Sequence, residues 1–219
     1  MSILQKLVTL LSPARRATTD ASANDTAAAL PASWLVIGLG NPGAKYEGTR
    51  HNVGYLAVDR LLERCRTVLE PVRGVKAQVS RVEIDGEGVL LVRSTTFMNL
   101  SGEAVAPLAA SYGIAADHVI AVHDELDLPA GKVKVKVGGN ENGHNGLKSI
   151  TGKLGTRDYV RVRVGIGRPA PGTGVVEHVL TGLDADRDWD AVADTAADAV
   201  DVIAGRGVSA AQNEIHGRG

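Results

Sequence analysis

The sequence has little of three features that would each point to a particular class of protein. Its single cysteine, Cys65, excludes an intrachain disulfide and fits a reducing, cytoplasmic compartment; we expect this thiol to be buried in the middle of a helix. No apolar run approaches the roughly 18–20 residues that a membrane-spanning helix needs. Aromatic residues make up only 3% of the chain, so the core must be built from Val, Ile, Leu and Ala.

The chain also lacks an overall excess of charge. Its formal net charge is −1, which argues against nucleic-acid binding, yet nine cations and two acids lie between residues 131 and 168. A length of 219 residues allows one domain with an ample core, and there is no repeat.

Residues 1–33 differ in composition from the rest of the chain. A short apolar stripe with helical spacing is followed, from Ala14 to Ser33, by Ala, Thr, Ser, Asp and Asn without periodicity. Polar residues interrupt the apolar stripe, so a secretory signal is not expected. We predict a disordered or weakly helical N-terminal extension at 1–33 and one catalytic domain at 34–219.

From Trp34 onward, strand and helix patterns alternate. Strands are expected at 35–37, 78–84, 88–93, 118–123, 132–137 and 159–166, and helices at 52–68, 101–112, 146–154 and 184–204. Asp85-Gly86 is typical of a hairpin turn, Asn52 of a helix N-cap and Gly205 of a helix end. This alternation predicts an α/β fold: a single-domain three-layer sandwich around a twisted, mixed, mostly parallel sheet.

The segment from Trp34 to Tyr55 is the most informative. A buried strand ends in Gly-Leu-Gly-Asn-Pro-Gly, which matches the dinucleotide-binding pattern G-x-G-x-x-G. In that fold a helix opens at the glycines, whereas polar residues intervene here, so we disfavour a nucleotide site. A rigid turn that carries Asn41, followed by His51 at the start of a helix, indicates half of an active site. The alternative is that His51 only helps to begin the helix.

Polar side chains also follow the other strands. Asn99 comes after the second hairpin strand, Asp124 after the next strand, and Asn145 at the end of a glycine-containing loop. Because ligands bind at the carboxyl ends of parallel strands, we expect these residues to converge with Asn41 and His51.

These motifs, read together, resemble a known family. GLGNPGAKYEGTRHN, TTFMNLSG, HDELDLPAGK, GHNGLKSI and RVRVGIGRP are similar, in order and spacing, to the bacterial-type peptidyl-tRNA hydrolases. The resemblance implies a monomeric cytoplasmic enzyme, without an obligate protein partner, that cleaves the ester between a peptide and its tRNA. It implies roles for seven residues: catalysis by His51, Asp124 and Asn41, and substrate binding by Tyr46, Met98, Asn99 and Asn145.

The residues support this chemistry independently. A histidine is suited to activating water near neutral pH, and Asp124 would fix its tautomer. The nucleophile motif G-x-S-x-G is absent, so we predict direct attack by water, with Asn99 or Asn41 stabilising the oxyanion. The alternative is a zinc site, but the zinc-binding motifs H-E-x-x-H and C-x-x-C are absent. We therefore predict no metal and no cofactor.

The sequence alone leaves the roles of other residues near these motifs open. We expect His123 to point away from Asp124 and pack inside, and His144 either to shape its loop or to touch substrate. Glu125 and Asp127 belong to the turn before Pro129, or accept a hydrogen bond from the nascent chain's amino group.

The cations of residues 131–168 suggest how tRNA would be held. Alternation places Lys134 and Lys136 on one strand face and Arg163 on the face of another, and we expect these three to contact phosphates. The alternative is a solvated sheet face. In the loop 138–146, which is glycine-rich in the family, Asn140, Glu141 and Asn142 intervene, so we expect reduced loop mobility and weaker tRNA affinity. A non-catalytic RNA-binding scaffold remains the alternative function.

Overall fold

The computed structural model describes residues 31–218; the expectations for residues 1–30 lie outside them. In this part of the chain seven strands form one sheet in the order β2-β3-β4-β1-β5-β7-β6. They are β1 (Ala32–Gly38), β2 (Glu70–Pro71), β3 (Ala77–Ile84), β4 (Glu87–Ser94), β5 (Val119–Glu125), β6 (Val133–Val137) and β7 (Val160–Gly165).

The four central strands run parallel, and antiparallel strands complete both edges. β1 lies between β4 and β5, so that Ile37 is opposite both Val92 and Ala121. β3 and β6 pair antiparallel with β4 and β7. The predicted mixed sheet is confirmed, with parallel pairing confined to its centre.

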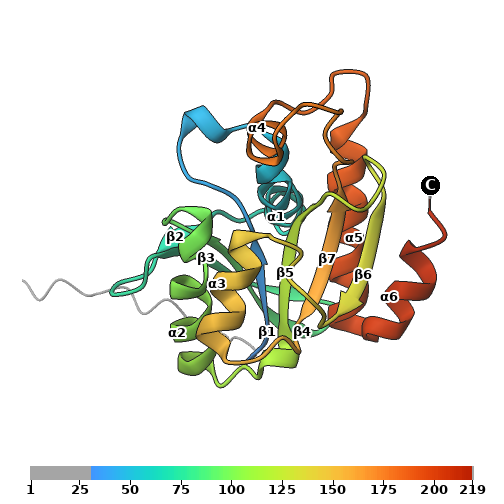
Figure 1. The fold of residues 1–219 in the computed structure, drawn as a ribbon. Helices are drawn as coiled ribbons and strands as arrows, with labels where there is room; N and C mark the ends of the chain where they lie inside the picture. The colour runs from blue at the N-terminus through green and yellow to red at the C-terminus, as the bar shows by residue number, and fades with distance from the viewer. Residues whose placement is uncertain (1–30, 219) are drawn as a thin grey trace, which may run out of the picture.

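Helices cover both faces of the sheet and complete the predicted three layers (Figure 1). They are α1 (Val53–Arg64), α2 (Gly102–Tyr112), α3 (Asn145–Leu154), α4 (Val175–Leu180), α5 (Trp189–Arg206) and α6 (Val208–Ile215). Short 3₁₀ turns occur at η1 (Ala44–Tyr46), η2 (Arg50–Asn52), η3 (Met98–Leu100) and η4 (Ala116–His118). α2 and α3 bury one apolar cluster, and α1, α5 and α6 bury the other. None of the helices described here is both long and apolar enough to cross a bilayer.

The hairpin turn is as predicted, whereas several helix ends differ. Asp85 and Gly86 both have positive φ, at 50° and 83°, as a type I′ turn requires. The last predicted helix begins later, because the Asp188 side chain accepts from the Ala191 amide, and it ends at Gly207 (φ 84°) rather than Gly205. α4 and α6 were not predicted. Cys65 is half-buried at the end of α1, not in its middle.

The outer edge of β6 is covered by α6. The Val135 amide donates to His216 Nε2 at 2.9 Å, and Gln212 Nε2 donates to the Val135 carbonyl at 3.3 Å. At the opposite edge of the sheet, β2 is only two residues long.

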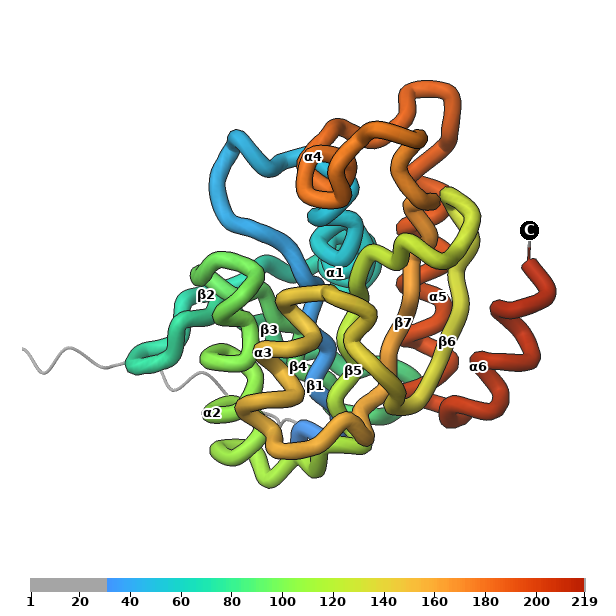
Figure 2. Tube along the Cα trace, viewed as in Figure 1, coloured from blue at the N-terminus to red at the C-terminus, as the bar shows by residue number. Residues whose placement is uncertain are grey.

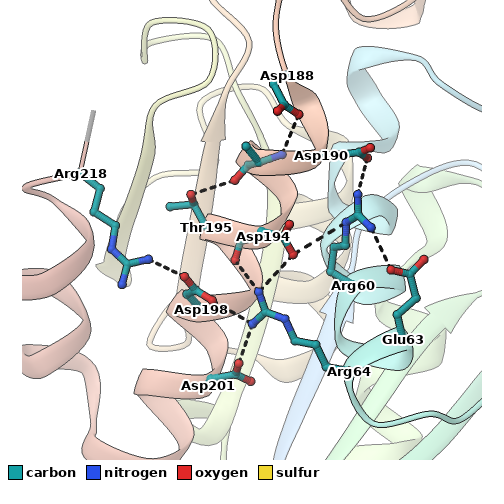
Figure 3. Close-up of polar contacts among 11 residues, drawn as sticks. Arg60, Glu63, Arg64, Asp188, Asp190, Asp194, Thr195, Asp198, Asp201 and Arg218 are labelled. Atoms are coloured by element: carbon teal, nitrogen blue, oxygen red, sulfur yellow. Dashed lines mark hydrogen bonds and ion pairs between the residues drawn. The ribbon is translucent and has the colours of Figure 1, made fainter.

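A surface network of charged side chains joins α1 to α5. Figure 3 shows Arg60 and Arg64 of α1 reaching the acidic side chains that line α5. Arg64 alone lies within 3.1 Å of carboxylate oxygens of Asp194, Asp198 and Asp201. Asp190, in the first turn of α5, pairs in the same way with Arg60 of α1 at 2.6 Å.

Candidate active site

A cavity of about 570 Å³ opens at the carboxyl ends of the parallel strands. The structure brings six of the seven residues implied by the family resemblance to its wall: Asn41, His51, Met98, Asn99, Asp124 and Asn145. The seventh, Tyr46, does not line the cavity. Its ring instead packs edge-on against Phe97, with 6.3 Å between the centroids.

Close backbone packing places His51 against the end of β5. A Cβ atom at Gly54 would lie 2.3 Å from the Val122 carbonyl oxygen and 2.5 Å from the Leu39 nitrogen. Only glycine therefore allows the start of α1 to approach the strand ends this closely. Because η2 immediately precedes α1, this contact carries His51 to the cavity.

The segment that follows α4 fixes η2 from its other side. In Figure 2 the chain after β1 and the chain around α4 lie side by side above the sheet. Thr49 forms an antiparallel bridge with Gly182, and the Arg50 guanidinium binds the Gly182 carbonyl and the Asp184 carboxylate. The helix α4 also adds apolar residues to the cavity wall: Val175, Val176, Val179 and Leu180. Sequence reasoning missed this wall because α4 is too short to give a clear periodic signal.

The Asp124 carboxylate joins two histidines. Its Oδ1 lies 2.8 Å from His51 Nδ1 and 2.9 Å from His144 Nε2, and its side chain is only 3% exposed. Burial raises the pKa of Asp124, but His144 and His51 outweigh that effect and hold the pKa well below its ordinary value. The carboxylate is therefore ionised and accepts from both rings. His51 then carries its proton on Nδ1, which leaves Nε2 as a base.

The tautomer of His144 is fixed by a helix end. His144 is the N-cap residue of α3, and its Nδ1 accepts from the amides of Gly146 (3.1 Å) and Leu147 (3.3 Å). The ring proton consequently lies on Nε2 and points to Asp124. The sequence left the role of His144 open, because it depends on how α3 docks against β5.

His123 is packed inside, as predicted, but it does not point away from Asp124, because both residues line the cavity beside His144. Its Nδ1 donates to the Asp124 carbonyl at 2.7 Å, and its ring lies 5.0 Å from that of His144. Burial lowers the pKa of His123 to about 3, so this ring is neutral at physiological pH. Its Nε2 is buried without a hydrogen-bond partner among residues 31–218.

Asn41 is held rigidly by Asn52, which occupies the predicted N-cap position of α1. The Asn52 side chain makes no cap hydrogen bond in α1. It accepts from the Asn41 amide (2.9 Å) and donates to the Asn41 carbonyl (3.0 Å). The Asn41 side-chain oxygen accepts from the Met98 amide at 2.8 Å, which leaves its NH₂ group to donate elsewhere.

The same cluster has the spacing of a metal site. One ligand atom from each of His51, Asp124 and His144 lies within 4.8 Å of the others. Both rings, however, already donate to a single carboxylate oxygen. A divalent ion would have to displace two ring protons and their hydrogen bonds, so the geometry favours a hydrogen-bonded cluster. The absence of a metal requirement stays a prediction.

Several charged residues around the site form ion pairs with one another. Arg163 pairs with buried Glu125 at 2.9 Å, and Asp127 pairs with Arg168. Arg161 is only 2% exposed, which contradicts the expectation of an open cationic face on β7. On β6, Val133 and Val135 are buried as the alternation predicted, but Val137 is 48% exposed. Lys134 and Lys136 form no ion pair with the described residues.

The fold and the site together define an α/β protein with a hydrogen-bonded His–Asp–His cluster in a cavity at the carboxyl ends of its parallel strands. The family model described as "Peptidyl-tRNA hydrolase" matches residues 35–219. The chain is 58% identical over 191 residues to Peptidyl-tRNA hydrolase 2 of Corynebacterium glutamicum, covering 86% of this chain and 91% of the relative. It is 46% identical over 188 residues to Peptidyl-tRNA hydrolase of Pseudarthrobacter chlorophenolicus, covering 84% and 95%.

A solved structure gives the same result. The crystal structure of peptidyl-tRNA hydrolase from Acinetobacter baumannii superposes with a TM-score of 0.77 at 33% identity, covering 86% of this chain and 96% of that one. The chain belongs to the peptidyl-tRNA hydrolase family, which confirms the resemblance seen in its motifs.

Proposed function

We propose that the protein hydrolyses the ester bond between a peptide, or an N-blocked aminoacyl group, and tRNA, and so recycles tRNA from prematurely released peptidyl-tRNA. One observation carries the proposal. In a chain of this family, His51 binds a buried, ionised Asp124 through Nδ1 and keeps Nε2 as a base in a cavity lined by asparagines.

The reaction proceeds by direct attack of water. His51 Nε2 removes a proton from a water molecule, the water oxygen bonds to the ester carbonyl carbon, and the tetrahedral intermediate expels the tRNA ribose oxygen. The histidine returns its proton to that oxygen, and Asp124 stabilises the imidazolium meanwhile. The described cavity wall contains no Ser, Thr or Cys, which supports attack without a covalent intermediate.

Two asparagines are candidates for stabilising the oxyanion. Because the Met98 amide fixes the Asn41 side chain, its NH₂ group is pre-oriented as a donor. Asn99 is exposed on the cavity wall and can approach the substrate from the other side. We assign Asn41 to orientation of the reacting groups and Asn99 and Asn145 to substrate binding, with Met98 beside them and Tyr46 at the margin.

Lys134 and Lys136 are the proposed tRNA phosphate contacts. Residues two apart on a strand project from the same face with a spacing of about 7 Å, which is close to that of neighbouring phosphates. Arg163 contributes less, because Glu125 offsets its charge. Raising the salt concentration should therefore weaken substrate binding steeply, and Lys134→Gln/Lys136→Gln should flatten that dependence.

The remaining expectations follow from the substrate. Peptidyl-tRNA is a product of translation, so we propose that the enzyme acts in the cytoplasm, as a monomer, without a cofactor or an obligate protein partner. Activity after chelation of divalent ions would test the cofactor statement, and sedimentation would test the oligomeric state.

The decisive experiment is release of an N-acetylated amino acid from its tRNA by the wild type and by His51→Ala. The wild type should release it, and the variant should lose about 10²–10⁴-fold in kcat while still binding tRNA. Binding without release by the wild type would instead identify an RNA-binding scaffold.

A further inference from the structure

The loop between β6 and α3, residues 138–144, has a backbone that needs external support. Four of its residues have positive φ: Gly138 (62°), Gly139 (94°), Asn142 (47°) and Gly143 (84°). Such a chain has many conformations open to it. Its second half, from Glu141 to His144, nevertheless forms part of the cavity wall. Something must hold this segment in a single conformation.

Two arginines beyond α3 supply that support. The guanidinium of Arg161 is buried and donates to the carbonyls of Asn140 (2.6 Å) and Gly139 (2.7 Å). Arg157 binds the Glu141 carboxylate, with Nε at 2.8 Å from Oε1 and Nη2 at 3.4 Å from Oε2. The Glu141 side chain is 11% exposed, whereas that of Arg157 is 55% exposed. Arg157 therefore reaches in from the surface to hold a nearly buried carboxylate.

A continuous series of contacts leads from this ion pair to the catalytic carboxylate. The Glu141 carbonyl accepts from the His144 amide at 2.8 Å, which closes the turn. The His144 ring then caps α3 through Nδ1 and donates from Nε2 to Asp124. Displacement of the Glu141 turn would move this ring, and Asp124 would lose one of its two donors.

We propose that the Arg157–Glu141 pair is a positioning device that holds the His144 turn, and through it the Asp124–His51 pair, in the reactive geometry. The inference rests on the proposed function and adds two residues to it that do not touch the reacting atoms. Because Arg157 is 55% exposed, solvent screens the pair and limits its contribution to global stability, so we assign it to local order rather than to the fold. The pair also explains why an acidic residue, Glu141, occurs in a loop that is expected to lie near phosphates.

Three variants of the full chain test the proposal with N-acetyl-aminoacyl-tRNA as substrate: Glu141→Gln, Arg157→Gln and the double variant. Each single substitution should lower kcat about tenfold, because a small displacement of a catalytic group is enough to slow the reaction. The two changes alter the local charge in opposite directions, so a purely electrostatic effect on tRNA would shift KM in opposite directions. The double variant should be no slower than the slower single one, because both break one contact.

Two further variants serve as controls. Arg157→Lys keeps a donor for Glu141 and should recover part of the lost kcat. Arg206→Gln removes a comparable Arg–Glu pair, Arg206–Glu214, whose arginine is 57% exposed, and should leave kcat unchanged. An unchanged kcat in both single variants, opposite shifts in KM alone, or additive losses in the double variant would overturn the proposal.

Hydrogen exchange separates this inference from the proposed function. The amides of residues 139–146 should exchange faster in Glu141→Gln and Arg157→Gln than in the wild type or in Arg206→Gln. If the wild type released no amino acid, the proposed function would fail, but faster exchange would still support the positioning role. Unchanged exchange would refute it.

Discussion

Two charged clusters in this molecule each join several side chains to one central group, but they differ in burial. Around Arg64 one guanidinium is shared by three aspartates, and the side chain is 34% exposed (Figure 3). Around Asp124 one carboxylate is shared by two histidines, and the side chain is 3% exposed. Water can replace any lost partner in the first cluster. In the second cluster each contact also fixes a proton on a particular atom, which a replacing water would not do.

The largest expected effect comes from the buried cluster. Asp124→Asn should lower kcat by about 10³-fold, because the neutral amide binds the ring protons more weakly than the carboxylate and cannot stabilise the imidazolium. Circular dichroism should show an intact fold. An activity within tenfold of the wild type would mean that His51 does not depend on this carboxylate.

The second-largest expected effect concerns His123 and the dependence of the free energy of unfolding on pH. His123 has a pKa of about 3 when folded and an ordinary value near 6.5 when unfolded, so unfolding takes up a proton between these limits. The free energy of unfolding should therefore fall by about 1.4 kcal/mol per pH unit, from this group alone, as the pH drops from about 6 to 4.

His123→Asn checks this expectation. Its amide can still donate to the Asp124 carbonyl but does not titrate, so urea unfolding from pH 6 to 4 should show a shallower slope than in the wild type. Asp124 destabilises the fold in acid as well, but chiefly below about pH 4, where its unfolded form binds a proton. Equal slopes for the wild type and His123→Asn would mean that His123 is already protonated in the folded state between pH 6 and 4.

A smaller effect is expected at the exposed cluster. Arg64→Gln should cost about 1 kcal/mol of unfolding free energy, because it removes a partly exposed network rather than a buried charge. Turnover should stay within twofold of the wild type. A large loss of activity would show that the junction of α1 with α5 controls the position of His51.

The smallest effect concerns salt. Raising NaCl from 0.1 to 1 M shortens the screening length from about 10 to 3 Å and should reduce the stability difference between the wild type and Arg64→Gln by a few tenths of a kcal/mol. The difference between the wild type and His123→Asn should change less, because His123 is only 2% exposed and buried groups are screened little by salt. Equal salt sensitivity would remove the distinction between the two clusters.

Local signals in the sequence predicted most of the fold. The hairpin turn at Asp85-Gly86 and the strand alternation that buries Val133 and Val135 depend only on neighbouring residues, and the structure agrees with both. The boundaries of α5 could not be read locally. Four aspartates precede or begin that helix, and only tertiary packing selects Asp188 as its cap.

The site was predictable to the extent that strand ends determine it. Asn41 and Asn99 follow strands and Asp124 lies at the carboxyl end of β5, so their convergence required only the order of elements. The roles of His144 and Asn52 depend on contacts between distant segments. His144 reaches Asp124 only when α3 docks beside β5, and Asn52 binds Asn41 only when the turn after β1 folds back over η2. Arg161 is likewise buried because it donates to carbonyls of the loop, and no periodic pattern in the sequence reveals this contact.

The cover that α6 places over β6 has a consequence for behaviour at high protein concentration. Exposed borders of β-sheets act as templates on which other chains can add strands and start fibrils. Here side chains of the same molecule occupy the Val135 backbone groups, and the far border ends in a two-residue strand. An incoming chain therefore meets occupied backbone groups at the β6 border, so this side of the sheet should resist amyloid-like stacking.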